Sequence, residues 1–301
     1  MPEDKQIPMV SVYMITYNHE PYIAQALESV LEQQTDFDFE IVIGDDCSTD
    51  GTTGIIAEYQ KKHPQKIHLL TSDTNLGAKE NSVRTLKACR GKYIATLEGD
   101  DYWTDPMKLQ KQIDFLERNP EFSACFGGYF VVDAFNNGEK INNIHPRQRS
   151  DKVLKNILGG YTIHPRTLIF RNHESLVRSF VNDFAECYNG DTAISFLIAT
   201  YGRIKYMDQL FAAYRMHQGG VYSTKSVEYH YNNLINTYTT IFKHLHSKSD
   251  KKVLSRTIAN FHRRLAIISF KEKQYIKSIR NLKNTFKYNM ITFFKTLREL
   301  I

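Results

Sequence analysis

The sequence lacks any long run of apolar residues. Its N-terminus, MPEDKQIPMV, has no apolar stretch after a basic head, and nowhere in the 301 residues do about 18 apolar residues follow one another. We therefore expect neither a signal peptide nor a membrane-spanning helix. The expected location is cytoplasmic.

Cysteine is scarce and widely spaced. No two cysteines form a C-x-x-C pair, and none has a histidine at zinc-site spacing. This spacing disfavours a zinc site and a disulfide framework. We expect the reduced thiols of a cytosolic protein at Cys47, Cys89, Cys125 and Cys187.

Motifs that bind nucleic acid and a glycine-rich loop that binds nucleotide phosphates are absent as well. The basic C-terminal part contains no zinc, helix-turn-helix or RNA-binding sheet motif, so we expect no nucleic-acid partner. The segment TYNHEPY contains no glycine, whereas a nucleotidyltransferase typically begins with a glycine-rich phosphate loop.

Charge is unevenly distributed along the chain. Residues 225–301 contain 16 Lys and Arg against 4 Asp and Glu, whereas residues 1–224 contain 23 against 29. This change in composition predicts a domain boundary, with one domain over 1–224 and a basic helical extension over 225–301.

The first hundred residues alternate between two patterns. Apolar runs predict strands at PMVSVYMIT, FEIVIGDD, KIHLLTS and GKYIATLEGDD, and the segments between them have helical periodicity. Such alternation predicts a mostly parallel α/β sheet flanked by helices, which binds ligands at the carboxyl ends of its strands. The loops at those ends are TYNHE, GDDCSTDGT and EGDDYW.

The later pattern is less regular. It predicts helices over 105–120 and 191–202, strands over 123–133 and 161–171, an irregular segment over 136–150, and helix from about residue 226 onward.

Three carboxylates lie within four residues in LEGDDYW: Glu98, Asp100 and Asp101. They fit a polar turn, since Gly and Asp are ordinary turn residues. They also fit a cation site, because two carboxylates about 4 Å apart repel by roughly 1 kcal/mol even in water. A site of this kind would suit Mg²⁺ or Mn²⁺. Spacing alone leaves both interpretations open.

Taken together, the motifs resemble family 2 glycosyltransferases, which are inverting enzymes of the GT-A fold. The matching stretches cover roughly residues 9–223 in the order that the family shows. They are VSVYMITYNHEPYIAQALESVLEQ, FEIVIGDDCSTDGT, NLGAKENSVRTLKACRGKYIATLEGDDYWTDPMKLQKQIDFLE, NGDTAISF and AAYRMH. The resemblance implies a Rossmann-like GT-A fold with a C-terminal helical extension.

The resemblance implies a nucleoside diphosphate sugar donor, with a UDP-sugar expected. Thr16, Tyr17 and Asn18 would contact the nucleotide, although Tyr17 also fits ordinary packing at a strand end. Asp46 would accept the imide N–H of uracil.

It also implies a Mn²⁺ or Mg²⁺ ion in an Asp-x-Asp signature, where this chain has Glu98 as the first acid. We predict Asp101 as a direct metal ligand, Asp100 as a ribose or metal contact, and Glu98 as a supporting residue. His217 would complete the metal shell or bond the phosphate, and Arg215 would contact the diphosphate. Mobility of the following loop is predicted from Gly219 and Gly220.

Inversion requires a base, and the matching position is Asp191, preceded by Gly190 where the family has an acid. Asp191 also suits a plain helix N-cap, and the two roles are compatible. Contacts to the substrate or acceptor are predicted for Glu98, Trp103, His164 and Arg166.

The basic tail has apolar residues at three- and four-residue steps from Ile276, with Lys and Arg at many positions between them. This amphipathic pattern fits a helix on an anionic membrane surface. It fits equally a helix packed on its neighbours or on a second copy, so an oligomer is also open.

We therefore expect a metal-dependent glycosyltransferase of the hexosyl- or N-acetylhexosaminyltransferase class, located in the cytoplasm, and peripheral at the inner face of the membrane if the basic tail binds lipid. Its acceptor would be a glycan or a lipid-linked oligosaccharide of cell-surface polysaccharide synthesis. The alternative is a non-catalytic relative that binds a nucleotide sugar or glycan.

Overall fold

The computed structural model describes residues 7–133, 140–142, 150–217 and 225–300. They form two compact units, which are described separately. The first unit comprises Met1–Lys152, Ile163–Ala185 and Leu197–His217, and the second comprises Val153–Thr162, Glu186–Phe196 and Gln218–Ile301. The second unit thus includes two segments from before residue 225. The single boundary after residue 224 stays a prediction.

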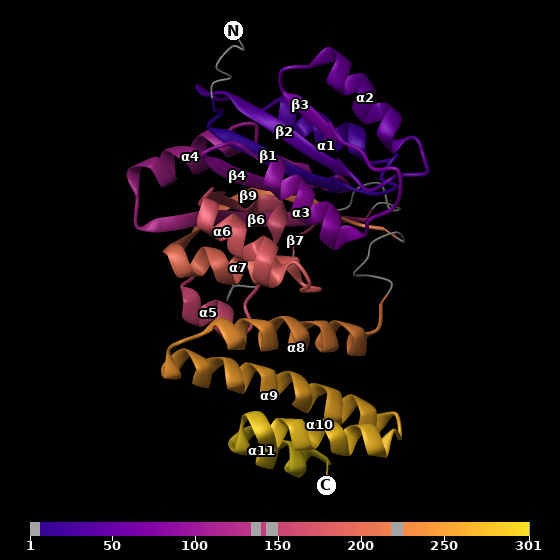
Figure 1. Cartoon of the computed structure of the whole chain (residues 1–301), viewed down its shortest axis with the longest axis vertical. Helices are drawn as coiled ribbons and strands as arrows, with labels where there is room; N and C mark the ends of the chain where they lie inside the picture. The colour runs from indigo at the N-terminus through magenta and orange to yellow at the C-terminus, as the bar shows by residue number, and fades with distance from the viewer. Residues whose placement is uncertain (1–6, 134–139, 143–149, 218–224, 301) are drawn as a thin grey trace. The chain divides into compact units, whose positions relative to one another are not determined.

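The N-terminal half of the first unit is a parallel sheet in the order β3-β2-β1-β4 (Figure 1). Helices connect successive strands, as the alternating pattern predicted. The strands are β1 (Val10–Thr16), β2 (Phe39–Asp45), β3 (Ile67–Leu70) and β4 (Tyr93–Glu98), and the connecting helices are α1 (Ile23–Leu31), α2 (Thr52–Lys62) and α3 (Ala78–Ala88).

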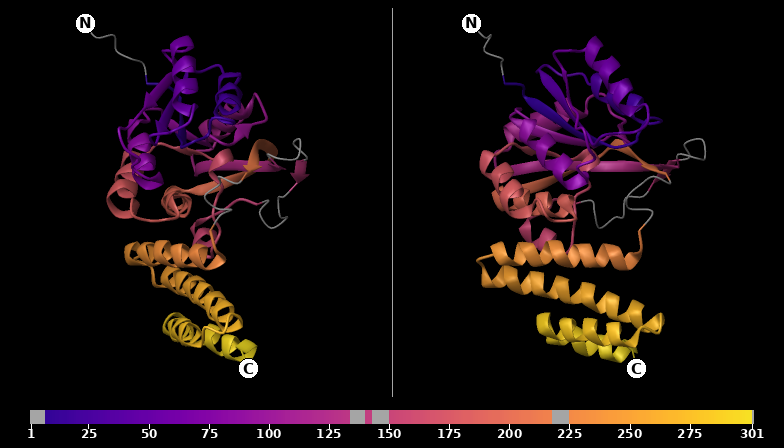
Figure 2. Two further views of the ribbon diagram at one scale, coloured as in Figure 1. Left: turned by 90° about the vertical axis from the view of Figure 1, so that its right-hand side faces the viewer. Right: turned by 45° about the vertical axis from the view of Figure 1, so that its right-hand side comes forward.

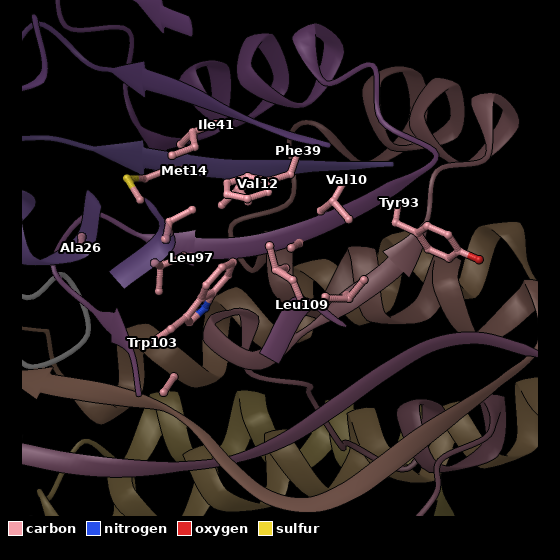
Figure 3. Packing of buried hydrophobic residues seen from close by; sticks show 14 of the residues in the cluster. Val10, Val12, Met14, Ala26, Phe39, Ile41, Tyr93, Leu97, Trp103 and Leu109 are labelled. Atoms are coloured by element: carbon pink, nitrogen blue, oxygen red, sulfur yellow. The ribbon is translucent and has the colours of Figure 1, made fainter. Parts of the chain in front are cut away.

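The core lies against these strands because the strands are apolar on both faces, as expected for a parallel sheet covered by helices. Every residue of β2 is buried, and Val10, Val12 and Met14 of β1 have no exposed surface. Figure 3 shows these side chains beside Leu97 and Trp103. The position of the parallel strands is therefore set by their apolar sequence.

The C-terminal half of the sheet is mixed. β8 pairs antiparallel with β4 and β6, β9 runs parallel to β6, and β5 and β7 pair antiparallel with β9 and β6. The bounds are β5 (Tyr102–Trp103), β6 (Phe122–Asp133), β7 (Lys140–Asn142), β8 (Ile169–Arg171) and β9 (Arg203–Met216).

Two predictions need correction here. The strand predicted over 161–171 is only β8, because the 3-10 helix η2 (Pro165–Thr167) precedes it. No strand was predicted for the residues of β9, whose register with β6 shifts at Gly127 and Gly128. Those shifts interrupt the period-2 alternation that would have revealed the strand.

Shorter helices complete the first unit. The helix predicted over 105–120 is α4 (Lys108–Arg118), which begins later than predicted, and Asp105 accepts a hydrogen bond from the Met107 backbone N–H at 2.9 Å. α6 (Glu174–Ser179) and η3 (Phe180–Phe184) follow β8. The predicted irregular segment over 136–150 lies mostly outside the described residues.

The second unit is helical. α8 (Val227–His244), α9 (Lys248–Lys271) and α10 (Tyr275–Tyr288) lie one beside the next (Figures 1 and 2). α11 (Met290–Leu300) packs on both α9 and α10, and α5 (Leu154–Leu158) packs on α9. α7 (Gly190–Tyr201) runs across the division between the two units. The predicted α/β class with a C-terminal helical region is confirmed.

No helix within the described ranges is long and apolar enough to cross a membrane. Cys47, Cys89, Cys125 and Cys187, all within the described residues, form no disulfide.

Candidate active site

Three loops meet at the carboxyl edge of the parallel strands. Thr16, the last residue of β1, is paired in register with Asp45 of β2, and Ile15 is paired with Glu98 of β4. Parallel strands end at the same edge, so the loops that follow them are brought together. The sequence prediction of a shared site at this edge therefore agrees with the register.

The first two loops are joined by hydrogen bonds. Asn18 donates its backbone N–H to Ser48 Oγ at 2.9 Å, and its Oδ1 accepts the Thr49 N–H at 2.8 Å. Asn18 and Cys47 have φ values of +55° and +60°, in the left-handed region that residues other than glycine rarely adopt. Such backbone geometry is concentrated at functional sites, where surrounding contacts hold it.

Asp46 is buried and held by its neighbours. Its backbone N–H donates to Thr16 O at 3.0 Å, and its Oδ1 accepts the Leu76 N–H at 2.7 Å. Tyr17, by contrast, leaves 44% of its surface exposed. The ring of Tyr17 is therefore accessible from solvent, whereas the carboxylate of Asp46, in the loop after the neighbouring strand β2, is fixed.

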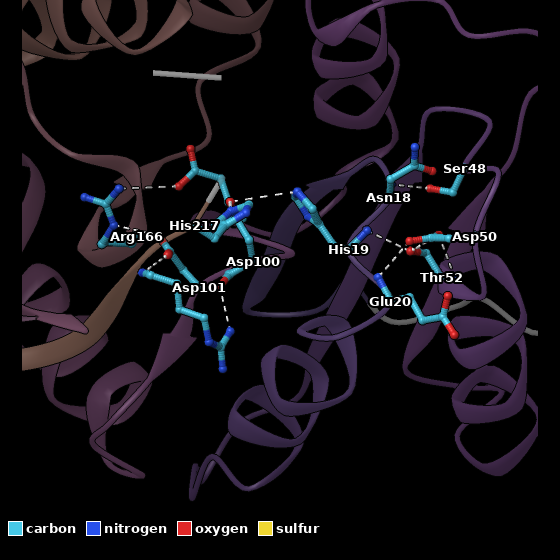
Figure 4. A network of polar contacts seen from close by, with 12 residues as sticks. Asn18, His19, Glu20, Ser48, Asp50, Thr52, Asp100, Asp101, Arg166 and His217 are labelled. Carbon is cyan, nitrogen blue, oxygen red and sulfur yellow. Dashed lines mark hydrogen bonds and ion pairs between the residues drawn. The ribbon is translucent and has the colours of Figure 1, made fainter. Parts of the chain in front are cut away.

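The adjacent acids Asp100 and Asp101 have different surroundings (Figure 4). Asp101 is 1% exposed; its Oδ2 accepts from Arg166 Nε at 2.7 Å and its Oδ1 from the Arg215 backbone N–H at 3.0 Å. Both of its oxygens are thus hydrogen-bonded within the protein. Burial raises the pKa of Asp101 to about 6, although Arg166 opposes this shift.

Asp100 instead contacts two histidines. Its Oδ2 lies 3.0 Å from His217 Nε2 and 3.8 Å from His19 Nε2. Burial alone would raise the pKa of Asp100, but the hydrogen bond to His217 and the nearby His19 lower it below its ordinary value. Burial also lowers the pKa of His19. One carboxylate oxygen of Asp100 thus lies beside two imidazole nitrogens.

Arg166 forms part of the support beneath this pair. Its guanidinium lies over the rings of Tyr129 and Tyr214, at 4.7 and 4.2 Å from their centroids. Burial alone would lower the pKa of Arg166, but Asp101 and Glu98 raise it. The charge of this buried cation is therefore balanced by acids of the EGDD segment.

Trp103 and His164 lie next to Arg166. Trp103 is buried and donates from Nε1 to the Arg166 carbonyl oxygen at 3.0 Å, while the His164 ring meets Tyr129 edge-on at 5.2 Å. These contacts are internal, so the structure gives Trp103, His164 and Arg166 a supporting position. Their predicted contacts with substrate stay predictions.

Arg215 fixes the backbone of the acidic turn. Its guanidinium donates to the Asp100 carbonyl oxygen at 2.6 Å and to Gln25 Oε1, and it lies over the rings of Tyr22 and Tyr102. The predicted diphosphate contact of Arg215 stays a prediction. Gly219 and Gly220 lie outside the described residues.

The donor set suits a divalent cation that is also held by its substrate. Across the described part of the chain, no three His, Cys, Asp or Glu side chains form a group that could hold a metal ion by themselves. Asp100 and His217 nevertheless offer two adjacent donor atoms. Mg²⁺ and similar ions are commonly held by one or two protein ligands together with substrate phosphates and water. Asp100 and His217 therefore fit the two protein ligands of such an ion.

A family model described as glycosyl transferase family 2 matches residues 11–176, which is more than half of the chain. The chain belongs to the family 2 glycosyltransferases.

Similar proteins come from several organisms. An uncharacterized protein of Mycobacterium tuberculosis is 35% identical over 214 residues, covering 71% of this chain and 60% of its own length. An uncharacterized glycosyltransferase of Methanocaldococcus jannaschii is 30% identical, covering 75% and 80%. A Bacillus subtilis protein named for teichuronic acid biosynthesis, TuaG, is 41% identical over 126 residues, covering 42% and 48%. The chain thus spans less than two thirds of the mycobacterial relative.

Solved structures share the fold. Residues 1–349 of Staphylococcus aureus TarS, in complex with UDP-GlcNAc, have a TM-score of 0.70 at 22% identity, covering 93% of this chain and 81% of that TarS chain. The mannosyltransferase PcManGT of Pyrobaculum calidifontis, in complex with GDP-Man and Mn²⁺, has a TM-score of 0.60 at 16% identity, covering 97% and 88%. The GT-A fold predicted for this glycosyltransferase is therefore confirmed.

Asp191, the predicted base of this glycosyltransferase, lies in the second unit, whereas the other predicted site residues lie in the first. It is exposed and belongs to the first turn of α7, which begins at Gly190. It therefore lies inside the helix and not at the cap position. Its role as the base stays a prediction.

One residue of this glycosyltransferase site was missed from the sequence. His19 lies in the quoted loop TYNHE but was assigned no role, and the structure brings its ring beside Asp100 and His217. A lone histidine at a strand end gives little signal. Its pairing with an acid 81 residues away becomes visible only when the strands are aligned.

Proposed function

We propose that this glycosyltransferase moves a sugar from a nucleoside diphosphate sugar to a hydroxyl group of a glycan or lipid-linked oligosaccharide, with inversion and with a divalent cation. The observation that carries the proposal is the contact between Asp100 Oδ2 and His217 Nε2 at 3.0 Å, at the edge where the three loops meet. A second imidazole, His19, lies beside it.

The nucleotide would bind along the first two loops. The carboxylate of Asp46 is fixed by the Leu76 N–H and is suited to accept the imide N–H of uracil, while Tyr17 offers an exposed ring to the base. Uracil is therefore the proposed base, and UDP the proposed nucleoside diphosphate of the donor. The TarS complex with UDP-GlcNAc is consistent with this choice, although GDP-Man is bound by the other neighbour.

Asp100 and His217 would hold the cation, which is Mn²⁺ or Mg²⁺. When bound, such an ion stabilises the negative charge that grows on the departing diphosphate. Asp101 was predicted as a direct ligand, but both of its oxygens accept hydrogen bonds from other residues. We therefore propose that Asp101 is a positioning residue, which acts with Arg166 and Arg215 to orient Asp100.

Asp191 would remove the proton from the acceptor hydroxyl. A hydroxyl group has a pKa far above 7, so a positioned carboxylate typically contributes 10² to 10⁴-fold to the rate. Its exposure at the start of α7 is compatible with meeting an acceptor. The name of the relative TuaG supports an acceptor in cell-surface polysaccharide synthesis.

The test measures binding and transfer separately. Isothermal titration with UDP should give tighter binding when Mn²⁺ is present, and Asp100→Asn and His217→Ala should each remove that difference. Asp114→Asn, on the exposed side of α4, is the matched control and should keep it. If both site variants keep the Mn²⁺-dependent affinity, the metal assignment is wrong.

Transfer is then assayed with Asp191→Asn. Donor affinity should be unchanged, and transfer to an acceptor should fall by roughly 10² to 10⁴-fold. Near-normal transfer by Asp191→Asn would reject this residue as the base without affecting the metal assignment.

A further inference from the structure

The last two helices bury polar side chains and expose apolar ones. The residues of α10 and α11 that are buried are all small or polar: Ser278, Asn281, Thr285, Thr292 and Thr296. Their exposed large apolar residues are between 52% and 81% accessible: Tyr275, Ile276, Ile279, Phe286, Met290, Ile291 and Phe294. A helix on the surface of a globular protein normally shows the opposite arrangement.

The buried polar side chains of α10 form hydrogen bonds with α9. Ser278 Oγ donates to the Ala266 carbonyl oxygen at 2.9 Å, and Asn281 Oδ1 lies 3.2 Å from His262 Nδ1. Small hydroxyl side chains also allow two helices to approach closely. α10 is therefore anchored to the unit through its polar face, so its apolar face remains outside without any loss of that packing.

The exposed side chains of the two helices form one surface. Phe286 of α10 packs edge-on against Phe293 of α11 at 5.1 Å, and Phe293 packs against Phe294 at 5.4 Å. These contacts join the two apolar faces. Contiguous apolar surface of this kind marks an interaction site more often than isolated apolar residues do. We call the seven exposed apolar residues of α10 and α11 the apolar tail surface.

The charges beside the apolar tail surface are almost all positive. Residues 275–300 contain six Lys and Arg and one acid, Glu299. That acid is already paired with Arg263, and Lys277 is paired with Glu228. The basic residues that remain exposed are Arg280, Lys283, Lys287, Lys295 and Arg298.

The positive charge beside the apolar tail surface distinguishes three candidate partners: a second copy of the chain, nucleic acid and an anionic bilayer. A second copy placed on the same face would bring the same basic residues together, and like charges repel. Nucleic acid would satisfy the basic residues but not the apolar ones. The surface of an anionic bilayer satisfies both, because apolar side chains enter the acyl boundary while Lys and Arg meet lipid phosphates.

We infer that α10 and α11 bind the surface of an anionic membrane through the apolar tail surface. In this arrangement the two helices lie along the bilayer surface, with the apolar tail surface toward the acyl chains. This inference goes beyond the proposed glycosyl transfer and does not depend on it, because membrane binding requires neither donor nor acceptor.

The experiment is vesicle flotation of the full chain without nucleotide. Vesicles of phosphatidylcholine alone are compared with vesicles that contain about 30% phosphatidylglycerol. We expect about tenfold stronger partitioning onto the anionic vesicles, and we expect it to fall when NaCl is raised from about 0.1 M to about 0.5 M.

Two variants test the two components. Ile279→Ser/Phe286→Ser/Phe294→Ser should reduce partitioning about tenfold, and Lys283→Glu/Lys287→Glu should remove the preference for anionic vesicles. The matched controls alter exposed residues elsewhere, with Ile7→Ser/Val227→Ser for the apolar change and Lys61→Glu/Lys62→Glu for the charge. Both control proteins should partition like the wild type.

Thermal unfolding checks that each variant keeps its fold, since all of the substituted residues are exposed. Equal partitioning of wild type and the serine variant would overturn the inference. A second pair of results would also overturn it. In that case the wild-type protein does not float with anionic vesicles, and light scattering shows that it is a stable dimer whereas the serine variant is a monomer.

Discussion

Replacing His164 should make the protein less stable than the wild type at neutral pH and more stable than the wild type at acidic pH. Burial, assisted by the positive charge of Arg166, lowers the pKa of His164 from 6.5 to about 4. Below pH 6.5 the unfolded chain takes up a proton that the folded protein does not. Because the folded-state pKa is depressed, the neutral ring contributes full stability above pH 6.5, and this contribution is lost as the pH falls toward 4.

The magnitude follows from the shift. One pKa unit corresponds to about 1.36 kcal/mol, so at pH 4.5 the wild type has lost at most about 2.5 kcal/mol through this residue. His164→Gln does not titrate, but it loses the edge-on contact with Tyr129, which is worth about 1 kcal/mol. The variant should therefore be about 1 kcal/mol less stable at pH 7 and about 1.5 kcal/mol more stable at pH 4.5, with equal stabilities near pH 6.

The measurement is urea unfolding at several pH values, followed by fluorescence. The chain has a single tryptophan, Trp103, which is buried and hydrogen-bonded to the neighbouring Arg166, so its emission reports loss of this region. Every other ionisable group is common to both proteins, so its contribution cancels in the difference. His63→Gln, at an exposed position, is the control and should show no reversal. A variant that is less stable than the wild type at every pH refutes the reasoning.

Three further changes test the support of the site. Lys108 is fully buried, its Nζ has no hydrogen-bond partner, and burial lowers its pKa to about 7. Lys108→Met should therefore raise the free energy of unfolding, measured in urea, by about 2–4 kcal/mol at pH 7 and by less at pH 9. A Cβ at Gly99 would lie 2.7 Å from Thr16 Oγ1, so Gly99→Ala should cost about 1–3 kcal/mol, whereas Gly54→Ala, with nothing within 4 Å, should cost nothing in the same thermal-unfolding assay. Asp101→Asn leaves the buried Arg166 with the more distant Glu98, at 3.9 Å, as its acidic partner and should cost about 3–5 kcal/mol by urea unfolding, and a loss below about 1 kcal/mol would contradict the pairing.

The parallel half of the fold could be predicted because local sequence determines it. The strands β1, β2 and β4 are short apolar runs that end in polar loops, and their parallel direction follows from the alternation with helices, whereas their order in the sheet was not predicted. The loops that contain Asn18, Asp46 and Asp100 could be identified for the same reason. Each of these features depends on residues that are adjacent in sequence.

The rest depends on contacts between distant segments. β9 was missed because its register shifts against β6 break the alternation, and the tail was predicted as one helix although Asn289 separates α10 from α11. The pairing of Arg166 with Asp101 spans 65 residues, and no local pattern indicates it. Sequence also gives no sign that the apolar side of α10 faces outward, because periodicity defines two faces without saying which one packs.

In the acidic run LEGDDYW, the neighbouring carboxylates of Asp100 and Asp101 have different partners. After β4 ends at Glu98, Asp101 is buried, where Arg166 balances its charge and the Arg215 backbone N–H donates to its Oδ1, while Asp100 contacts His217. Arg215 also holds the Asp100 carbonyl oxygen, so the inward pair and the histidine contact are built on the same backbone turn. Three carboxylates can therefore be adjacent without mutual repulsion dominating: a buried cation pairs with Asp101, and the carboxylate of Asp100 remains available to imidazole nitrogens and, in the proposed reaction, to a metal.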